Sequence, residues 1–359
     1  MTPKPIPASG GLVQGPAGPT PEAETERVQL GHGSGGRMSR DLLWDRFMPA
    51  FRNEILEGLG DGSVVPLEGG EIVVSTDSFV VAPLEFPGGN IGDLAVNGTI
   101  NDLAMMGAEP QYLTVGFILE EGLPFQLLDR VLESMAQAAR AAGVLVVAGD
   151  TKVVERGKAD GLFINTTGIG RVLPDFRPGP HRAESGDAVL VSGPLGRHGI
   201  TVLAARGELE LRVDLESDTA PLHGLVAALR EGAGRAVHVL RDPTRGGLAS
   251  TLNEVATASG VGIEVDETTL PIPGPVQGAC ELLGLDPLYV ANEGILVAVV
   301  DGEQAGRVLE VLRAHPLGRG AAVIGRVTSD HRGMVVMRTP LGGTRVVDLL
   351  PGDQLPRIC

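Results

Sequence analysis

The sequence predicts an α+β protein built from two domains. Its 359 residues exceed the roughly 100 to 200 residues of a single domain. Patterns typical of strands and helices follow one another without the regular alternation of a parallel doubly wound sheet. Residues 173–181 hold three prolines, which interrupt both helices and strand ladders, so we expect the domain boundary there.

The first domain is expected over residues 28–173, after a tail at residues 1–27. This tail has almost no large apolar residue, so it buries too little surface to offset the entropic cost of ordering. A helix is predicted over residues 39–59 because apolar side chains recur there at helical spacing. The other elements follow from the same periodicities. In chain order they are a strand at 71–81, a helix at 91–107, a strand at 111–119, a helix at 125–142, and strands at 144–148 and 162–169.

The second domain is expected over residues 182–345, followed by a mobile tail at 346–359 that carries Cys359. Prolines at positions 351 and 356 and the lack of any period predict that this tail forms neither helix nor strand. The expected elements of the domain are strands at 187–191, 261–265, 289–300, 321–327 and 334–338, and helices at 201–205, 220–229, 248–259, 276–283 and 302–314.

The composition excludes several classes of protein. Apolar residues make up 43% and charged residues 21%, and no apolar run approaches the roughly 18 to 20 residues of a membrane span. The first residues lack a basic segment followed by an apolar one, so we expect no secretory signal and a cytoplasmic location. A net charge of −16 repels nucleic-acid phosphates. A bound nucleotide would therefore need backbone N–H groups and a divalent cation.

The first candidate phosphate site is the glycine-rich segment before the helix at 39–59. Glycines let successive N–H groups approach a phosphate closely, at or near the N-terminus of a helix. A flexible loop is the alternative, because the segment matches no established nucleotide-binding pattern. The candidate residues are Gly33, Ser34, Gly35 and Gly36.

The second candidate site combines Asp77, in the strand at 71–81, with the polar residues of the helix at 91–107. That helix carries Asp93, Asn97, Asn101 and Asp102, several of which lie four residues apart and share a face. Short oxygen ligands of this kind suit Mg²⁺ and the oxygens of substrate phosphates. A solvated polar face is the alternative.

Two further motifs follow apolar strands or open helices. In Gly149-Asp-Thr-Lys152, Asp150 and Thr151 could contact a metal or water, and Lys152 could act as an acid or base or simply lie at the surface. Asp242-Pro-Thr-Arg-Gly-Gly247 opens the helix at 248–259 and could bind phosphate, with Asp242 as a helix cap as the alternative. Glu293, before an apolar strand, is either a base or ligand or a turn residue.

Cys359 is the last residue of the sequence and lies in the predicted mobile tail. A thiol there could act as a carrier, because a dozen extended residues span on the order of 40 Å. An accidental exposed cysteine is the alternative. Cys280 lies in an apolar helix and is expected to serve packing.

Taken together, these motifs resemble the HypE family of hydrogenase maturation proteins. This family belongs to a superfamily of ATP-dependent enzymes with aminoimidazole ribonucleotide synthetase, selenophosphate synthetase and thiamine monophosphate kinase. The resemblance runs from about residue 30 to residue 359. It is carried by His32-Gly-Ser-Gly-Gly36, Ser75-Thr-Asp-Ser-Phe79, Phe86-Pro-Gly-Gly89, Gly98-Thr-Ile-Asn-Asp102, Gly149-Asp-Thr-Lys152, Asp242-Pro-Thr-Arg-Gly-Gly247 and, above all, Pro356-Arg-Ile-Cys359.

The resemblance implies a two-domain PurM-like ATP-binding fold and an ATP-dependent carbamoyl dehydratase. A HypF-type partner would carbamoylate Cys359, and ATP would drive dehydration of the carbamoyl group to a thiocyanate. The nitrile would then pass to iron on a HypC–HypD complex as a cyanide ligand of [NiFe]-hydrogenase. The superfamily also implies a homodimer formed through first-domain sheets.

The resemblance further implies roles for individual residues. Asp61, Asp102 and Asp242 would bind Mg²⁺, with Asp61 in a turn that matches the family pattern loosely. Asp77 and Asp150 would contact ATP or a second metal, and Lys152 and Glu293 would exchange protons with the bound tail. The remaining residues expected to bind ATP are Gly33, Ser34, Gly35, Gly36, Asn97, Thr151, Thr244, Arg245 and Gly246.

Two other functions fit parts of the sequence. A phosphotransferase or synthetase acting on a free small molecule would use the same phosphate site and leave Cys359 without a role. A non-catalytic thiol carrier or scaffold would present Cys359 and bind the nucleotide only as a conformational ligand. Neither explains why one chain combines a phosphate site with a cysteine on a tail.

Overall fold

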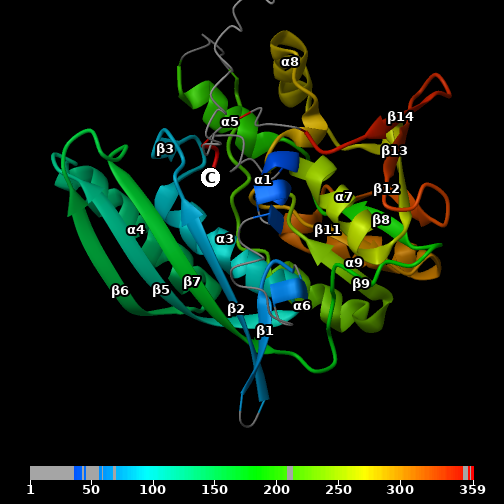
Figure 1. Cartoon of the computed structure of the whole chain (residues 1–359), viewed down its shortest axis with the longest axis horizontal. Coiled ribbons are helices and arrows are strands. Elements are labelled where there is room, and N and C mark those ends of the chain that lie inside the picture. Colours follow the sequence, from blue (N-terminus) through cyan, green and yellow to red (C-terminus); the bar gives the residue numbers. More distant parts are fainter. Residues whose placement is uncertain are drawn as a thin grey trace, which may run out of the picture.

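The computed structural model describes residues 36–42, 44–45, 56–58, 60–67, 70–207, 213–350, 355 and 357–359. The predicted tail at 1–27, the motif residues Gly33, Ser34 and Gly35, and most of the predicted helix at 39–59 lie outside these residues. Of that helix, the structure describes α1 (Arg37–Leu42) and the short 3-10 turn η3 (Leu56–Gly58). The described residues form two mixed sheets with helices packed on them, which confirms the α+β class (Figure 1).

The first sheet contains five strands in the order β1-β2-β7-β5-β6. Its neighbouring strands are antiparallel except for β5 and β6, which are parallel and are connected through the helix α4 (Phe125–Ala142). The strands are β1 (Ser63–Leu67), β2 (Gly70–Phe79), β5 (Ala108–Glu120), β6 (Leu145–Val154) and β7 (Leu162–Val172). A short hairpin of β3 (Glu85–Phe86) and β4 (Gly89–Asn90) precedes the central helix.

That central helix, α3 (Ile91–Met105), lies between the first sheet and the second half of the chain (Figure 1). Nearly all of its residues are buried, the polar Asn97, Thr99 and Asn101 among them, because the first sheet covers one side of the helix and elements of the second half cover the other. Its N-terminus is closed by a capping box, in which Gly92 N donates to Asn90 Oδ1 (2.7 Å) and Asn90 N donates to Asp93 Oδ1 (2.7 Å). Asp93 therefore caps the helix.

The second sheet contains seven strands in the order β14-β13-β10-β12-β8-β11-β9. Only β10 and β13 are parallel neighbours. The strands are β8 (Ala188–Val191), β9 (Val237–Arg241), β10 (Gly262–Asp266), β11 (Val297–Val300), β12 (Ala322–Thr328), β13 (Val335–Arg338) and β14 (Thr344–Val347). The helices are α5 (Arg197–Ala205), α6 (His223–Gly232), α7 (Gly247–Ser259), α8 (Gly274–Leu283) and α9 (Ala305–Ala314). Among the described residues, no helix is long and apolar enough to cross a membrane.

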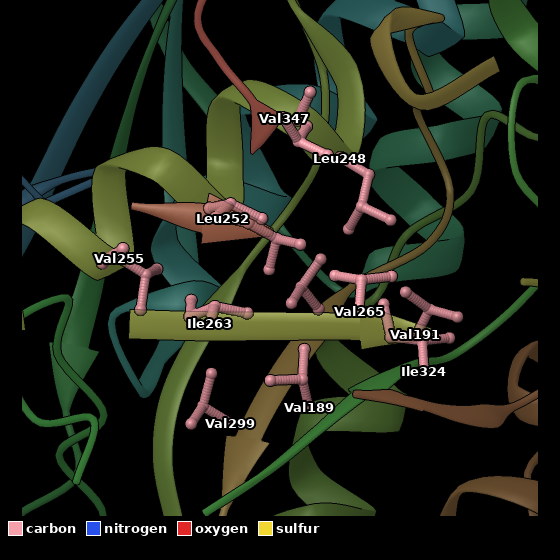
Figure 2. Close-up of a cluster of buried hydrophobic side chains, with 14 of the residues drawn as sticks. Val189, Val191, Leu248, Leu252, Val255, Ile263, Val265, Val299, Ile324 and Val347 are labelled. Carbon is pink, nitrogen blue, oxygen red and sulfur yellow. The ribbon is translucent and has the colours of Figure 1, made fainter. Parts of the chain in front are cut away.

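The largest apolar core of the second half lies under α7 (Figure 2). Leu248, Leu252 and Val255 recur at helical spacing along α7 and point onto the sheet. They meet Ile263 and Val265 of β10, and the core continues through β8, β11 and β12. This packing fixes α7, and with it the loop that leads into α7 from β9.

Two apolar clusters join the halves of the molecule. One packs Ala104 and Met105 of α3 against residues of α6. The other packs Val202, Ala291 and Ile358 into the core formed by α3, α4 and the first sheet. The space between the halves is therefore partly filled by the C-terminal segment.

Several sequence predictions were wrong in their limits. β6 extends to residue 154, so the motif at 149–152 lies inside an exposed edge strand rather than after a strand. Only residues 297–300 of the strand predicted at 289–300 lie in the sheet, and the predicted range begins inside a 3-10 turn at Pro287–Tyr289 that Asp286 caps. The strands β1, β3, β4, β9 and β14 were not predicted, since runs of two to five residues carry too little pattern.

Candidate active site

Three carboxylates from distant parts of the chain meet near the junction of the two halves. Asp61 precedes β1, Asp102 lies in the last turn of α3, and Asp242 follows β9. One oxygen from each lies within 4.8 Å of the others. The Ser75 hydroxyl lies 2.6 Å from Asp102 Oδ2 and 3.0 Å from the Asp61 carbonyl oxygen, which ties β2 to this cluster. We refer to Asp61, Asp102 and Asp242 as the aspartate cluster.

Burial and mutual repulsion shift the pKa of every member of the aspartate cluster upward. Burial raises the pKa of Asp61 to about 8, although Arg241, 3.0 Å away, opposes the shift. Burial also raises the pKa of Asp242 to about 6. For Asp102, burial and then the charges of Asp242, Asp77 and Asp61 raise the pKa well above its usual value.

This cluster has the properties of a divalent cation site. Three carboxylates form a hard oxygen donor set, which suits Mg²⁺. Asp61 Oδ2 is buried and has no hydrogen-bond partner in the described structure, so it is free to act as a ligand. A cation would also relieve the repulsion that raises the three pKa values.

Asp77 and Arg245 adjoin the cluster. Burial raises the pKa of Asp77, and the nearby Arg245 guanidinium partly offsets the shift. The pKa of Arg245 is in turn raised by Cys359 first, and then by Asp77, Glu293 and Asp102. The arginine is therefore the positive group that the acidic side chains and Cys359 share.

Glu293 is almost completely buried, and its Oε1 has no hydrogen-bond partner in the described structure. Burial, followed by the charges of Asp242, Asp77 and Asp218, raises its pKa well above the usual value. Asp218 fixes the backbone here, because it accepts hydrogen bonds from the N–H groups of Glu293 and Gly294. A Cβ at Gly294 would lie 1.6 Å from the Asp218 carbonyl oxygen, so only glycine fits.

The last residues of the chain lie between the halves, and Figure 1 marks the C-terminus between β3 and α5. Val80 N donates to the Cys359 carbonyl oxygen (3.0 Å), and Ala82 N donates to that of Arg357 (3.3 Å). The Ile358 side chain is 3% exposed and packs into the apolar cluster that both halves share. Residues 357–359 are therefore docked, and Cys359 lies close enough to Arg245 to raise the pKa of its guanidinium.

The structure does not bring Asp150, Thr151 and Lys152 to the aspartate cluster. They lie in the exposed outer strand β6, where Lys152 Nζ is 2.5 Å from Asp150 Oδ2. The register pairs Asp150 with Gly116, Asn165 and Ser78, whereas Asp77 falls in the next row and faces α3. Because neighbouring rows point to opposite faces, Asp150 and Asp77 lie on different sides of the sheet.

The predicted polar face of α3 has several separate roles. Of its four acidic and amide residues, only Asp102 joins the aspartate cluster. Asn97 Nδ2 donates to Thr219 Oγ1 (3.3 Å), while Asn97 Oδ1 is buried without a hydrogen-bond partner in the described structure. Asn101 binds backbone groups of the second half.

The remaining predicted residues lie in turns. Thr244 N donates to the Asp242 carbonyl oxygen (3.0 Å), and Gly246, with a φ of 75°, caps α7. Gly36, the described end of the glycine-rich segment, is buried immediately before α1. In the sequence, Gly36 precedes the first member of the aspartate cluster, and Thr244 and Gly246 follow the last.

Sequence reasoning gave no role to Arg241, Asp218 or His198. Arg241 lies beside Asp242 in the motif, so its position was a usable signal. Asp218 had no signal, since it is a single acid in a polar loop. His198 is buried, and its Nε2 lies 2.8 Å from the carbonyl oxygen of Ile358.

Comparisons with known proteins agree with this architecture. Residues 59–172 and 184–338 match the N-terminal and C-terminal domain families of AIR synthase related proteins. The chain is 55% identical to the carbamoyl dehydratase HypE of Azotobacter vinelandii, over 92% of this chain and 97% of that protein.

Two solved structures are also similar to this chain. A HypE–HypF complex contains a chain 46% identical to this one, with a TM-score of 0.82 over 86% of this chain and 99% of that chain. A HypE structure in complex with ATP is 51% identical, with a TM-score of 0.78 over 91% and 98% of the two chains.

Proposed function

The chain belongs to the HypE family of carbamoyl dehydratases, and from that membership we propose that it uses ATP to dehydrate a carbamoyl group carried on Cys359 to a thiocyanate. The product would supply cyanide during maturation of [NiFe]-hydrogenase. The observation that supports Cys359 as the carrier is its docked position between the halves, beside Arg245, whose pKa both Cys359 and Asp102 raise.

The reaction removes the carbamoyl oxygen as phosphate. The carbamoyl oxygen attacks the γ-phosphorus of ATP, and the bond between that phosphorus and ADP breaks. The C–O bond then breaks, phosphate leaves, and the C–N bond becomes triple as nitrogen loses two protons. One proton leaves with the phosphate and the other goes to a base.

The residues around Cys359 fit the demands of this chemistry. Asp61, Asp102 and Asp242 would hold Mg²⁺, which when bound stabilises the charge of the transferred phosphoryl group. Arg245 would stabilise the anionic oxygen of the docked group. Glu293, with its raised pKa, is our candidate for the proton acceptor.

Removing water is as important as activating oxygen, because an activated carbamoyl group hydrolyses readily. Ile358 and the apolar cluster around it cover one side of the docked segment. Asp242 and Glu293 are buried at the same junction. The site therefore favours loss of phosphate within the junction over attack by solvent.

We also infer a homodimer formed through the first sheet. Its edge strand β6 and the neighbouring strand β5 expose apolar side chains that would be covered in an assembly. These are Tyr112 and Ile118 of β5 and Leu145, Val146, Val147 and Val153 of β6. In a single copy, two strands separate β6 from β2, which is roughly 14 Å at the usual strand spacing. A role for Asp150, Thr151 or Lys152 in ATP binding or proton transfer therefore requires a second copy.

The partners follow from the same family membership. One similar structure is a HypE–HypF complex, so we propose a HypF-type carbamoyltransferase as the donor of the carbamoyl group. A HypC–HypD complex would accept the cyanide, and all of these reactions would take place in the cytoplasm.

Intact-mass spectrometry tests the proposed function. The protein is incubated with its carbamoylating partner, carbamoyl phosphate and ATP, and the peptide containing Cys359 is weighed. We expect an adduct of about 43 Da that loses about 18 Da only when ATP and Mg²⁺ are present, because a thiocyanate differs from a thiocarbamate by one water. Cys359→Ser is the matched control. Continued ATP consumption with an unmodified Cys359 would instead indicate a synthetase acting on a free small molecule.

A further inference from the structure

The two ends of one helix hold the docked C-terminal segment. His198 lies in the first turn of α5, and Arg206 immediately follows the last. His198 Nε2 is 2.8 Å from the carbonyl oxygen of Ile358, and Arg206 Nη2 donates to that of Arg357 (2.8 Å). Two consecutive peptide carbonyls are therefore bound from the second half of the molecule.

His198 is fixed in a single orientation. Its side chain is fully buried, its Nδ1 is 2.8 Å from Ser217 Oγ, and its ring meets Phe86 edge-on with centroids 5.4 Å apart. Burial lowers the pKa of His198, which favours the neutral ring, although Asp218 and the Ile358 carbonyl oppose the shift. A neutral ring facing a carbonyl oxygen must carry its proton on Nε2, so Nδ1 accepts from Ser217.

Arg206 links the docked segment to the first half as well. Its Nε donates to the Ala82 carbonyl oxygen (2.9 Å), while Ala82 N donates to the Arg357 carbonyl oxygen (3.3 Å). The Arg357 carbonyl oxygen therefore accepts hydrogen bonds from Ala82 in the first half and from Arg206, which follows α5, in the second half.

The backbone of Arg357 shows that the docked conformation is imposed by its surroundings. Its φ is 56°, a conformation that is strained for a non-glycine residue and persists only where contacts hold it. The guanidinium donates to the Val80 carbonyl oxygen (3.2 Å), pairs with Asp160 and lies over the Phe163 ring.

We propose that His198 and Arg206 form a clamp for the carbonyls of residues 357 and 358, and that this clamp positions Cys359 in the site. The inference deepens the proposed function, on which it rests for the identity of Cys359 as the carrier. The clamp binds main-chain atoms and Ile358 packs into the apolar cluster, so these contacts hold the tail through groups other than the sulfur. His198 and Arg206 are positioning residues.

The rate at which a maleimide alkylates Cys359 in the full-length protein tests the clamp without ATP or any partner. His198→Phe keeps the ring and removes the donor, and Arg206→Met keeps the aliphatic length and removes the charge. We expect each to raise the rate at Cys359 by roughly 5- to 10-fold, since each loses a hydrogen bond that holds the tail. His198→Gln keeps an N–H donor and is expected to return the rate to within about twofold of the original protein. The exposed residues His181 and Arg319 provide matched controls, as His181→Phe and Arg319→Met.

An internal readout shows whether each variant is still folded. The buried Cys280 should alkylate at an unchanged slow rate, which reports that the fold is intact. If alkylation of Cys280 is also faster in His198→Phe, the fold of that variant is disturbed. The rates at Cys359 in Arg206→Met and His198→Gln then test the clamp. An unchanged rate at Cys359 in Arg206→Met and in a folded His198→Phe would overturn the clamp, even if dehydration proceeds. Faster alkylation without any dehydration would uphold the clamp and overturn only the proposed function.

Discussion

Asp61, Asp102 and Asp242 hold protons at pH values where isolated aspartates have lost them. Their pKa values in the folded protein are raised, to about 8 for Asp61 and about 6 for Asp242. Between about pH 4 and pH 8 the folded chain therefore binds more protons at these groups than the unfolded chain does. Stability must fall as pH rises through this window, because ionisation then favours the unfolded state.

Because the pKa values of the aspartate cluster are raised, stabilisation of the protein by Mg²⁺ should depend on pH. In the presence of a chelator, the free energy of unfolding should fall as the pH rises from 5 to 8, because the aspartate cluster ionises. Added Mg²⁺ should restore the lost stability. The rise in melting temperature caused by Mg²⁺ should be larger at pH 8 than at pH 5.5, and at 100 times the dissociation constant it corresponds to about 2.7 kcal/mol. Asp102→Asn should abolish most of this rise. Equal Mg²⁺ effects at both pH values would contradict cation binding at the cluster.

At the scale of single elements, the crossing of α3 and α4 depends on Gly92. A Cβ there would lie 2.3 Å from the Val131 carbonyl oxygen, so Gly92→Ala must push the helices apart. We expect it to lower the free energy of unfolding by about 1–3 kcal/mol, measured by urea denaturation. Gly278→Ala is the matched control in α8, where a Cβ meets nothing within 4 Å, and it should raise stability by up to about 1 kcal/mol. Equal effects of the two changes would show that the crossing tolerates expansion.

The exposed strand β6 allows a test of the inferred dimer interface. Leu145 is 63% exposed, and Leu145→Lys would place a charge in the inferred dimer interface. Sedimentation should then show a shift from dimer to monomer, because burying an unpaired ammonium group is costly. Leu282→Lys, at a 79% exposed position on α8, should leave the mass unchanged. A Leu145→Lys protein that stays dimeric would place the interface elsewhere.

At the scale of the whole molecule, Asn101 connects the two halves. Its Nδ2 donates to the Ala220 carbonyl oxygen (3.1 Å), and Leu222 N donates to its Oδ1 (2.7 Å). Asn101→Leu should lower the free energy of unfolding by about 3 kcal/mol, because buried backbone groups of the second half lose their partners. Urea denaturation measures this change, with Asn165→Ala on the exposed face of the first sheet as the control. A loss below about 1 kcal/mol would mean that water or a rearranged backbone replaces the amide.

Asn101 also shows what the sequence could and could not predict. Periodicity located α3, α4 and most long strands, because amphipathic or buried elements repeat their pattern over ten or more residues. It read the polar residues of α3 as one ligand face, whereas Asn97 and Asn101 bind groups about 120 residues further along the chain. The aspartate cluster joins residues separated by 41 and 140 positions, so its members followed from the family resemblance and not from spacing.

The order of strands in the two sheets has a consequence for synthesis on the ribosome. All five strands of the first sheet lie between residues 63 and 172, so that sheet can close before the second half is made. In the second sheet, β8 pairs with β11 and β12, and about 130 residues separate β8 from β12. At about 5–20 residues per second, β8 waits on the order of 10 s for β12. During that interval an apolar strand lacks its neighbours, which makes the nascent second half the stage most exposed to misfolding and to capture by chaperones.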